Sequence, residues 1–321
     1  MTCAQYHGGP AKKLVCLETE GNAGTLEGTG GSLNELAQQP GVGNTGWSSY
    51  GSVEKDLELT EADFARVREL IHKRAGIVLA EHKREMVYSR LAKRLRHYGL
   101  TRFSDYLARL ERRPDSQEWE AFTNALTTNL TAFFREAHHF PQLVAHVRDR
   151  TGSVRIWCAA ASTGEEPYSI AITLAETFSN RTVDAKVVAT DIDTEALAKA
   201  RAGIYPLEQV HKLEEARIKR FFQRGTGGQA GLARVRPEIR AMVEFQTINL
   251  MGSQWPVRGP FDAIFCRNTM IYFDKPTQAR ILGRFAPLLK PDGLLFAGHS
   301  ENFSHISDAF RLRGQTIYTL A

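Results

Sequence analysis

The sequence predicts an α/β protein with a doubly wound, mostly parallel sheet, a helical bundle ahead of it and a small antiparallel β-subdomain inserted in it. Strand-like and helix-like segments alternate from about residue 150 onward. Apolar residues recur at helical spacing within residues 56–128, and the glycine-rich residues 206–240 interrupt the later alternation. A composition of 42% hydrophobic and 24% charged residues excludes fibrous and wholly disordered classes.

Residues 1–55 contain 11 of the 26 glycines and show no sustained periodicity, which predicts a flexible extension. No apolar run is long enough for a signal peptide or a membrane-spanning helix, so we expect a cytoplasmic protein without membrane insertion. The cysteines have neither zinc-site nor C-x-x-C spacing, which fits buried thiols in a reducing compartment and predicts no metal. They are Cys3, Cys16, Cys158 and Cys266.

Residues 56–128 are predicted to form four helices. The first begins after Thr60, which with Asp63 forms a plausible capping pair. The others are expected at about Glu81–Tyr98, Phe103–Leu110 and Glu118–Thr127. Residues 56–113 hold 14 Lys and Arg against 9 Asp and Glu, equal to the net charge of +5 of the whole chain. Lys83, Arg90, Arg94 and His97 fall on one side of the second helix, which is either a docking face for an acidic partner or an ordinary solvated face.

The second part of the chain, residues 129–321, supplies the predicted sheet. Short apolar runs predict strands at Val154–Ala160, Ala185–Thr190, Val243–Leu250, Phe261–Cys266 and Leu294–Gly298. Helices are expected at Tyr168–Phe178, Thr194–Ala202 and about 276–286, and Phe310–Leu320 is expected to be a terminal hairpin around Gly314. Within residues 206–240, a helix-like run from Leu207 to Phe222 precedes a glycine-rich hairpin.

The turn after the first strand, residues 161–167, carries Glu165 and Glu166 and lacks the G-x-G-x-x-G pattern. Two carboxylates repel a pyrophosphate, so the turn disfavours a dinucleotide and suits a cationic ligand. A second interpretation stays open, because Thr163 and Glu166 have the spacing of a capping box.

Polar residues follow three further strands, at the sheet edge where ligands bind in this fold. Asp191 could accept hydrogen bonds from ribose hydroxyls or could cap the next helix, a role that Asp193 could also fill. Asn249 ends the third strand, and Arg267 with Asn268 end the fourth. Acidic groups without a phosphate loop together indicate S-adenosylmethionine. The roles of Glu301 and of Asn129 at the domain junction stay open.

Five strings resemble the chemotaxis receptor methyltransferase family of CheR type, whose members esterify receptor glutamates. They are TNLTAFFREAHHF (128–140), STGEEPYSIAI (162–172), ATDID (189–193), FDAIFCRNTMIYFD (261–274) and LKPDGLLFAGHSE (289–301). The resemblance implies S-adenosylmethionine as cofactor, with contacts at Asn129, Thr131, Arg135, Glu166, Asp191, Asn249, Leu250, Arg267 and Asn268. It further places Arg135 and Tyr272 beside the reacting centre.

The resemblance also implies partners. Lys83, Arg90 and Arg94 would dock the acidic methylation helices of a chemotaxis receptor. The small β-subdomain would bind a tether peptide at the C-terminus of a receptor, through residues that the pattern assigns to Arg224, Gly225, Gly227, Gly231 and Arg234. We expect a monomer that does not bind nucleic acid.

Two alternatives stay open at this point. One is an S-adenosylmethionine-dependent RNA methyltransferase that uses the basic helix on phosphates, although exposed aromatic residues for base stacking are not evident. The other is a binding module of the same fold that senses S-adenosylmethionine, or scaffolds a signalling array, without catalysing transfer.

Overall fold

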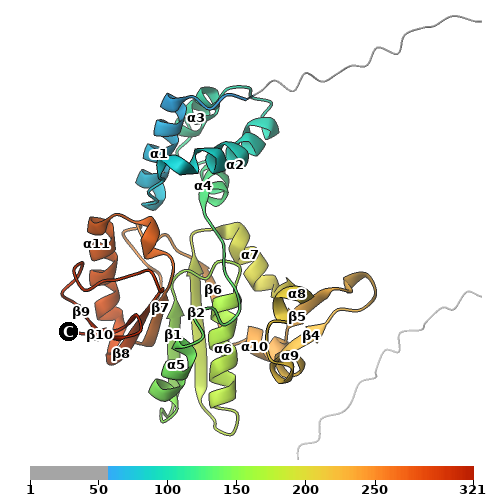
Figure 1. Cartoon of the computed structure of the whole chain (residues 1–321), viewed down its shortest axis with the longest axis vertical. Helices are drawn as coiled ribbons and strands as arrows, with labels where there is room; N and C mark the ends of the chain where they lie inside the picture. The colour runs from blue at the N-terminus through green and yellow to red at the C-terminus, as the bar shows by residue number, and fades with distance from the viewer. Residues whose placement is uncertain (1–56) are drawn as a thin grey trace, which may run out of the picture. The chain divides into compact units, whose positions relative to one another are not determined.

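The computed structural model describes residues 57–321 (Figure 1). The flexible extension predicted for residues 1–55 lies outside the described residues. Within residues 57–321, no helix has both the length and the apolar character needed to cross a bilayer.

The four helices predicted in the first region are present (Figure 1). They are α1 (Glu61–Ala75), α2 (Arg84–His97), α3 (Phe103–Glu111) and α4 (Glu118–Leu126), and one 3-10 turn, η1 (Glu81–Lys83), precedes α2. The Thr60 hydroxyl accepts the backbone N–H of Asp63, and the Asp63 carboxylate accepts the backbone N–H of Thr60, so the predicted capping box is confirmed. The helices pack around their own apolar cluster, which includes Phe64, Leu91 and Phe122.

The large sheet has seven strands in the order β6-β2-β1-β7-β8-β10-β9, and it confirms the predicted doubly wound class. Neighbouring strands are parallel from β6 to β8, and the terminal hairpin adds β10 and β9 antiparallel. The strands are β1 (Ser153–Cys158), β2 (Asp184–Asp191), β6 (Val243–Thr247), β7 (Phe261–Cys266), β8 (Leu289–Ala297), β9 (Phe310–Gly314) and β10 (Ile317–Leu320).

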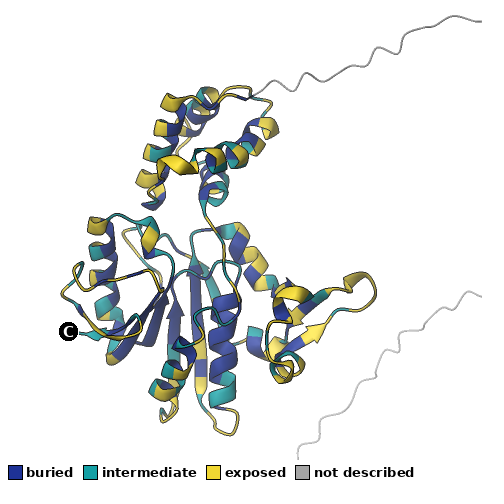
Figure 2. Ribbon diagram, viewed as in Figure 1, coloured by how far each residue is buried: buried dark blue, intermediate teal, exposed yellow. Residues whose placement is uncertain are grey.

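Both faces of this sheet are buried by helices, as the dark central strands of Figure 2 show. Successive residues of a strand point to opposite faces. Thus Ile156 belongs to the apolar cluster under α5 (His139–Val147), α6 (Glu165–Thr177) and α7 (Thr194–Ala202). The next residue, Trp157, belongs to the cluster that includes residues of α11 (Lys275–Phe285). Because both faces are buried, the central strands appear in the sequence as continuous apolar runs. Two 3-10 turns, η3 (Met270–Tyr272) and η4 (Ala286–Leu288), flank α11.

A second sheet of three antiparallel strands has the order β3-β5-β4. It consists of β3 (Ile204–Pro206), β4 (Phe222–Arg224) and β5 (Leu232–Val235), with α8 (Leu207–Val210), α9 (Glu215–Phe221), η2 (Gly227–Gln229) and α10 (Pro237–Arg240) between or after the strands. The predicted glycine-rich hairpin is formed by β4 and β5. The single helix-like run expected from Leu207 to Phe222 is wrong, because it is broken into α8 and α9 and its last residue begins β4.

Candidate functional site

One cavity of about 420 Å³ lies at the carboxyl ends of β1, β2, β6 and β7. Residues 75–86 and 126–135 complete its wall. The residues that the resemblance assigned to the cofactor all line it, as do Tyr272 and Lys83. The cofactor set is Asn129, Thr131, Arg135, Glu166, Asp191, Asn249, Leu250, Arg267 and Asn268. The volume and the mixed polar and apolar wall suit a small-molecule ligand of nucleoside size.

The β1–α6 turn corrects the capping-box interpretation. Helix α6 begins at Glu165, and its N-cap is Gly164 with φ 101°, a left-handed conformation that favours glycine. A Cβ on Gly164 would lie 2.7 Å from the Tyr205 hydroxyl, so the position also lacks room for a side chain. Thr163 donates its hydroxyl to the carboxylate of Glu165 at 2.6 Å and does not cap the helix. Glu166 therefore does not take part in a capping box, and it lines the cavity.

Asp191 ends β2 with its carboxylate against two backbone donors. The N–H groups of Ser162 and Asp193 donate to it at 2.7 and 2.9 Å. Asp193 is the N-cap of α7, through the N–H of Ala196 at 2.9 Å, so Asp191 is not needed as a cap. Burial raises the pKa of Asp191 to about 6. A partly buried carboxylate that lines a cavity gains from a ligand that brings hydroxyl donors to it.

Asn129 lies in the cavity wall but already has two partners. Its Nδ2 donates to Asp193 at 2.7 Å, and its Oδ1 accepts the Ser162 hydroxyl at 3.1 Å. Thr127 also donates its hydroxyl to Asp193, at 2.5 Å. The segment that follows α4 is therefore fastened to the ends of β1 and β2, and Asn129 shapes the cavity through these bonds.

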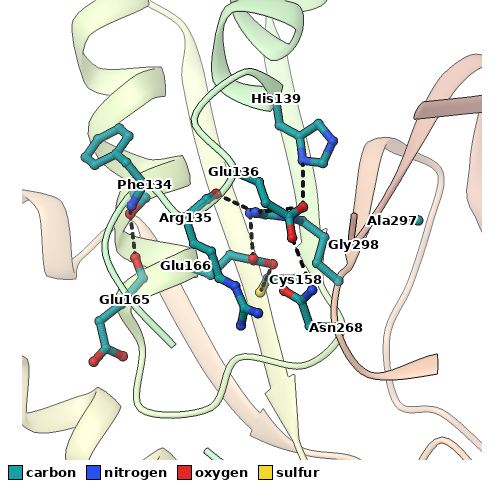
Figure 3. A network of polar contacts seen from close by, with 12 residues as sticks. Phe134, Arg135, Glu136, His139, Cys158, Glu165, Glu166, Asn268, Ala297 and Gly298 are labelled. Atoms are coloured by element: carbon teal, nitrogen blue, oxygen red, sulfur yellow. Dashed lines mark hydrogen bonds and ion pairs between the residues drawn. The ribbon is translucent and has the colours of Figure 1, made fainter. Parts of the chain in front are cut away.

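Figure 3 shows a polar network around Glu136, Glu166 and Asn268, and the ion pairs of Arg267 connect its two carboxylates. Arg267 is 4% exposed and forms ion pairs with Glu166 at 2.8 Å and with Glu136 at 3.3 Å, and it also donates to the backbone carbonyl of Arg135. Burial raises the pKa of Glu166 against the opposing charge of Arg267. Burial acts on Glu136 in the same direction, but Arg267 and bonds from Asn268 and His299 outweigh it and lower the pKa. We infer that one guanidinium holds two carboxylates of unequal acidity beside the cavity.

Sequence reasoning missed Glu136. Its Oε1 accepts the side-chain amide of Asn268 and the N–H of His299, both at 3.1 Å. Arg135 lies between Phe134 and Glu136, whose backbone φ values of 52° and 53° are left-handed. The only local signal was an acidic residue next to a predicted site arginine.

His139, on the first turn of α5, is fully buried, and burial lowers its pKa to about 4. It therefore serves packing and is neutral at pH 7.

Glu301, left open in the sequence, shapes the loop after β7. Its carboxylate accepts the N–H groups of Asn268 at 3.0 Å, Thr269 at 2.9 Å and Met270 at 2.8 Å. This loop leads into Tyr272, whose carbonyl accepts the N–H of Val78 at 2.8 Å. Glu301 therefore positions cavity residues without lining the cavity.

Asn249 and Leu250 lie beyond β6, which ends at Thr247 rather than at the predicted Leu250. The Asn249 amide donates to the carbonyl of Arg74 at 2.7 Å, at the end of α1, and accepts the N–H of Met251 at 2.9 Å. Leu250 is 6% exposed and contributes an apolar part of the wall.

Two of the three predicted docking residues have partners inside the helical region. Arg94 donates to Glu118 at 2.9 and 2.6 Å, and this bond raises the pKa of Arg94. Arg90 donates to the backbone carbonyls of Ala125, at 3.3 Å, and Thr127. Lys83, by contrast, is exposed at the edge of the cavity. A docking role for Arg90 and Arg94 stays a prediction: Arg94 is already paired with the Glu118 carboxylate, and Arg90 already donates to backbone carbonyls.

The predicted tether residues lie on the small sheet and not in the cavity wall. Arg224 pairs with Ala233, whereas Arg234 pairs with Gln223 and Ile204. Because directly paired residues share a face and successive residues alternate, the two arginines lie on opposite faces of this sheet. Gly227 and Gly231 have φ values of 55° and 87°, and a Cβ on Gly225 would lie 2.1 Å from the Gln229 carbonyl oxygen. Each glycine is therefore required by the hairpin itself.

The sheet order and the cavity at the carboxyl ends of its parallel strands are typical of a ligand-binding α/β protein of the methyltransferase class. Residues 129–319 match the family described as "CheR methyltransferase, SAM binding domain", and residues 62–127 match "CheR methyltransferase, all-alpha domain". The chain belongs to the CheR methyltransferase family.

Curated relatives agree with this assignment. The chain is 61% identical over 273 residues to the chemotaxis protein methyltransferase of Klebsiella aerogenes, covering 85% of this chain and 94% of that protein. It is 61% identical over 265 residues to the chemotaxis protein methyltransferase of Escherichia coli, covering 83% and 93%. It is 54% identical over 270 residues to chemotaxis protein methyltransferase 2 of Pseudomonas aeruginosa, covering 83% and 96%.

Proposed function

We propose that this protein transfers a methyl group from S-adenosylmethionine to glutamate side chains of chemotaxis receptors, forming glutamate methyl esters. The observation that carries the proposal is that seven residues from four separate strings, together with Asn249 and Leu250, line a single cavity. Membership of the CheR methyltransferase family and relatives named chemotaxis protein methyltransferases support it. These names favour a receptor substrate over RNA.

The cavity residues fit the cofactor. Asp191 is a partly buried acceptor at the end of β2, where it would accept hydrogen bonds from the ribose hydroxyls. Glu166, paired with Arg267, and Asp191 place two carboxylates in the cavity wall, where a cationic group of the ligand could lie. Thr131, Asn268 and the apolar Leu250 would complete the contacts. When bound, S-adenosylmethionine supplies a methyl group on a positively charged sulfur.

The acceptor needs orientation rather than a base. A glutamate has an ordinary pKa of about 4.3, so its carboxylate is already ionised at pH 7. Neither His138 nor His139 lines the cavity. Arg135 would hold the substrate carboxylate through a bidentate contact, and Tyr272 would line the path and donate a hydrogen bond. The chain's main contribution is then alignment and exclusion of water.

The partners remain part of the proposal. Lys83, with Arg90 and Arg94, would attract the acidic methylation helices, and the β4–β5 hairpin would hold a receptor tether peptide. The free edge of β4 in the three-stranded sheet supports the second idea, because an extended peptide can add a strand to such an edge. A cytoplasmic location and a monomeric state are also predictions.

The proposal is tested by incubating the protein with radiolabelled S-adenosylmethionine and receptor-containing membranes. We expect alkali-labile methyl esters on the receptor and no label on added RNA. The variant Arg135→Ala should lower kcat by about 100-fold, more than it weakens cofactor binding, because the guanidinium aligns the acceptor. Cofactor binding without transfer to any receptor would instead favour the sensing role, and equal activity of the variant would refute the positioning role.

A further inference from the structure

Several large apolar side chains in the wall of the cavity are exposed. Five such side chains are strongly exposed within residues 57–321, and three of them line the cavity. These three are Leu130 at 79%, Ile271 at 52% and Val78 at 48% exposure. The other two, Ile204 at 40% and Leu312 at 46%, lie on β3 and β9 and do not line it.

Each of the three is tied to one of the two residues expected at the reacting centre. Arg135 donates a hydrogen bond from Nη1 to the carbonyl of Leu130 at 3.0 Å. Ile271 directly precedes Tyr272 in η3, and Val78 donates its N–H to the carbonyl of Tyr272 at 2.8 Å. Leu130 is therefore positioned relative to Arg135 by a side-chain hydrogen bond, Val78 relative to Tyr272 by a backbone hydrogen bond, and Ile271 by its place next to Tyr272 in the chain.

We propose that Leu130, Ile271 and Val78 form an apolar rim that binds a nonpolar side chain of the receptor helix, one helical turn from the glutamate to be methylated. This rests on the proposed function and adds to it a requirement on the substrate sequence. Residues one turn apart share a helix face, so a carboxylate and a nonpolar group spaced in this way reach Arg135 and the rim together. The exposed ammonium of Lys83 at the same cavity complements the negative charge of the same helix.

The rim explains how substrate selection can occur although the acceptor group is common. A carboxylate alone does not distinguish one surface glutamate from another, whereas covering exposed apolar side chains removes nonpolar surface from water and favours a helix with a matching group.

The variant Leu130→Ser tests the rim, with Leu312→Ser as the matched control. Leu312 has comparable character and exposure but lies on β9, outside the cavity wall. We expect Leu130→Ser to raise KM for the receptor by about tenfold. Receptor binding would cover the Leu130 side chain, and burying a leucine contributes at least this much free energy. Leu312→Ser should leave KM unchanged, and both variants should bind S-adenosylhomocysteine as the unaltered protein does. A second variant, Ile271→Ser, should raise KM in the same direction.

Changes on the receptor complete the test. Serine in place of the nonpolar residue one turn from the methylated glutamate should raise KM for the unaltered protein and add little to Leu130→Ser, because both remove the same contact. An unchanged KM for Leu130→Ser, or weaker S-adenosylhomocysteine binding that accounts for the whole loss, would overturn the inference. If the unaltered protein forms no receptor methyl esters, the proposed function fails and the inference falls with it.

Discussion

Arg94 in the helical region and Arg267 at the cavity are both held by carboxylates, yet the two clusters differ in what surrounds them. Glu118, the partner of Arg94, also accepts the hydroxyls of Tyr98 and Tyr106, both at 2.7 Å. Glu118 is thus satisfied on both oxygens inside the helical bundle. Arg267 faces two carboxylates, and both Arg267 and Glu166 line the cavity.

The acidities of the carboxylates reflect this difference. Burial alone would raise the pKa of Glu118. The hydrogen bonds from Arg94, Tyr98 and Tyr106 outweigh burial and lower this pKa below its ordinary value. Burial instead raises the pKa of Glu166, which receives one guanidinium N–H and a weak contact from the Cys158 thiol at 3.5 Å. The comparison teaches that a buried ion pair with all its acceptors filled is a structural element that cannot lose one partner without cost, while one with acceptors left over at a cavity can serve a ligand.

The largest effect is expected for Arg267→Met. It leaves Glu136 and Glu166 unpaired and removes the donor to the Arg135 carbonyl, so the cavity cannot keep its shape. We expect the variant to lose about 4 kcal/mol of stability, since a buried partner is left unpaired, and to bind S-adenosylhomocysteine more weakly because the cavity wall is displaced. Isothermal titration calorimetry measures the affinity for S-adenosylhomocysteine. Arg94→Met is the matched control and should change the affinity by less than about twofold. Equal losses of affinity in the two variants would contradict the comparison.

The fold was largely predictable because periodicity is local. Apolar runs marked the strands, and the topology of a parallel sheet brings their carboxyl ends together, so Asp191 and Arg267 could be assigned to one site. Glu136 could not be found, because its partner Arg267 is 131 residues away. The capping box at Thr163 failed for a different reason. The pattern was present, but the left-handed Gly164 moved the start of α6 to Glu165.

The same distinction separates Arg94 from Lys83. Helical spacing placed both on one side of the second helix, but spacing does not reveal that Arg94 has a partner in Glu118, on another helix. An arginine side chain can be bound within its own domain while a nearby lysine remains free for a partner.

A second prediction concerns stability. Glu118→Gln should lower the free energy of unfolding by about 3 kcal/mol, because the charge-assisted bond from Arg94 is lost. Since the pKa of Glu118 is lowered in the folded protein, this difference should be present above the ordinary pKa of 4.5 and should vanish as the pH falls through the lowered value. Urea denaturation followed by circular dichroism measures it. Glu85→Gln, at an exposed position of α2, is the control and should show no such loss.

A third, smaller effect is the pH dependence of ligand affinity at the cavity. Asp191 has a pKa of about 6, so it is ionised at pH 7.5 and protonated at pH 5. Affinity for S-adenosylhomocysteine should fall by about tenfold per pH unit below this pKa as the acceptor is lost. The raised pKa has the opposite effect on stability, which gains from Asp191 at low pH and loses that contribution as the pH rises through about 6. Asp191→Asn should bind weakly with a flatter pH profile; an unchanged profile would exclude Asp191 as the titrating acceptor.

The smallest effect is expected at the edge of the cavity. Lys83→Ala should raise KM for the receptor by about threefold at low salt, and the difference should disappear at high salt, as for an exposed charge. Lys93→Ala provides the comparison, because Lys93 is exposed on α2 but does not line the cavity. An equal salt-dependent change in both variants would show that the whole helix, and not the cavity edge, attracts the receptor.

The most direct test of the central claim is a crystal structure of this protein with S-adenosylhomocysteine. The account predicts the ribose hydroxyls against Asp191, with the sulfur on the side of the cavity that holds Arg135 and Tyr272. Density for the ligand elsewhere, or a phosphate-bearing molecule bound in this cavity in its place, would contradict it.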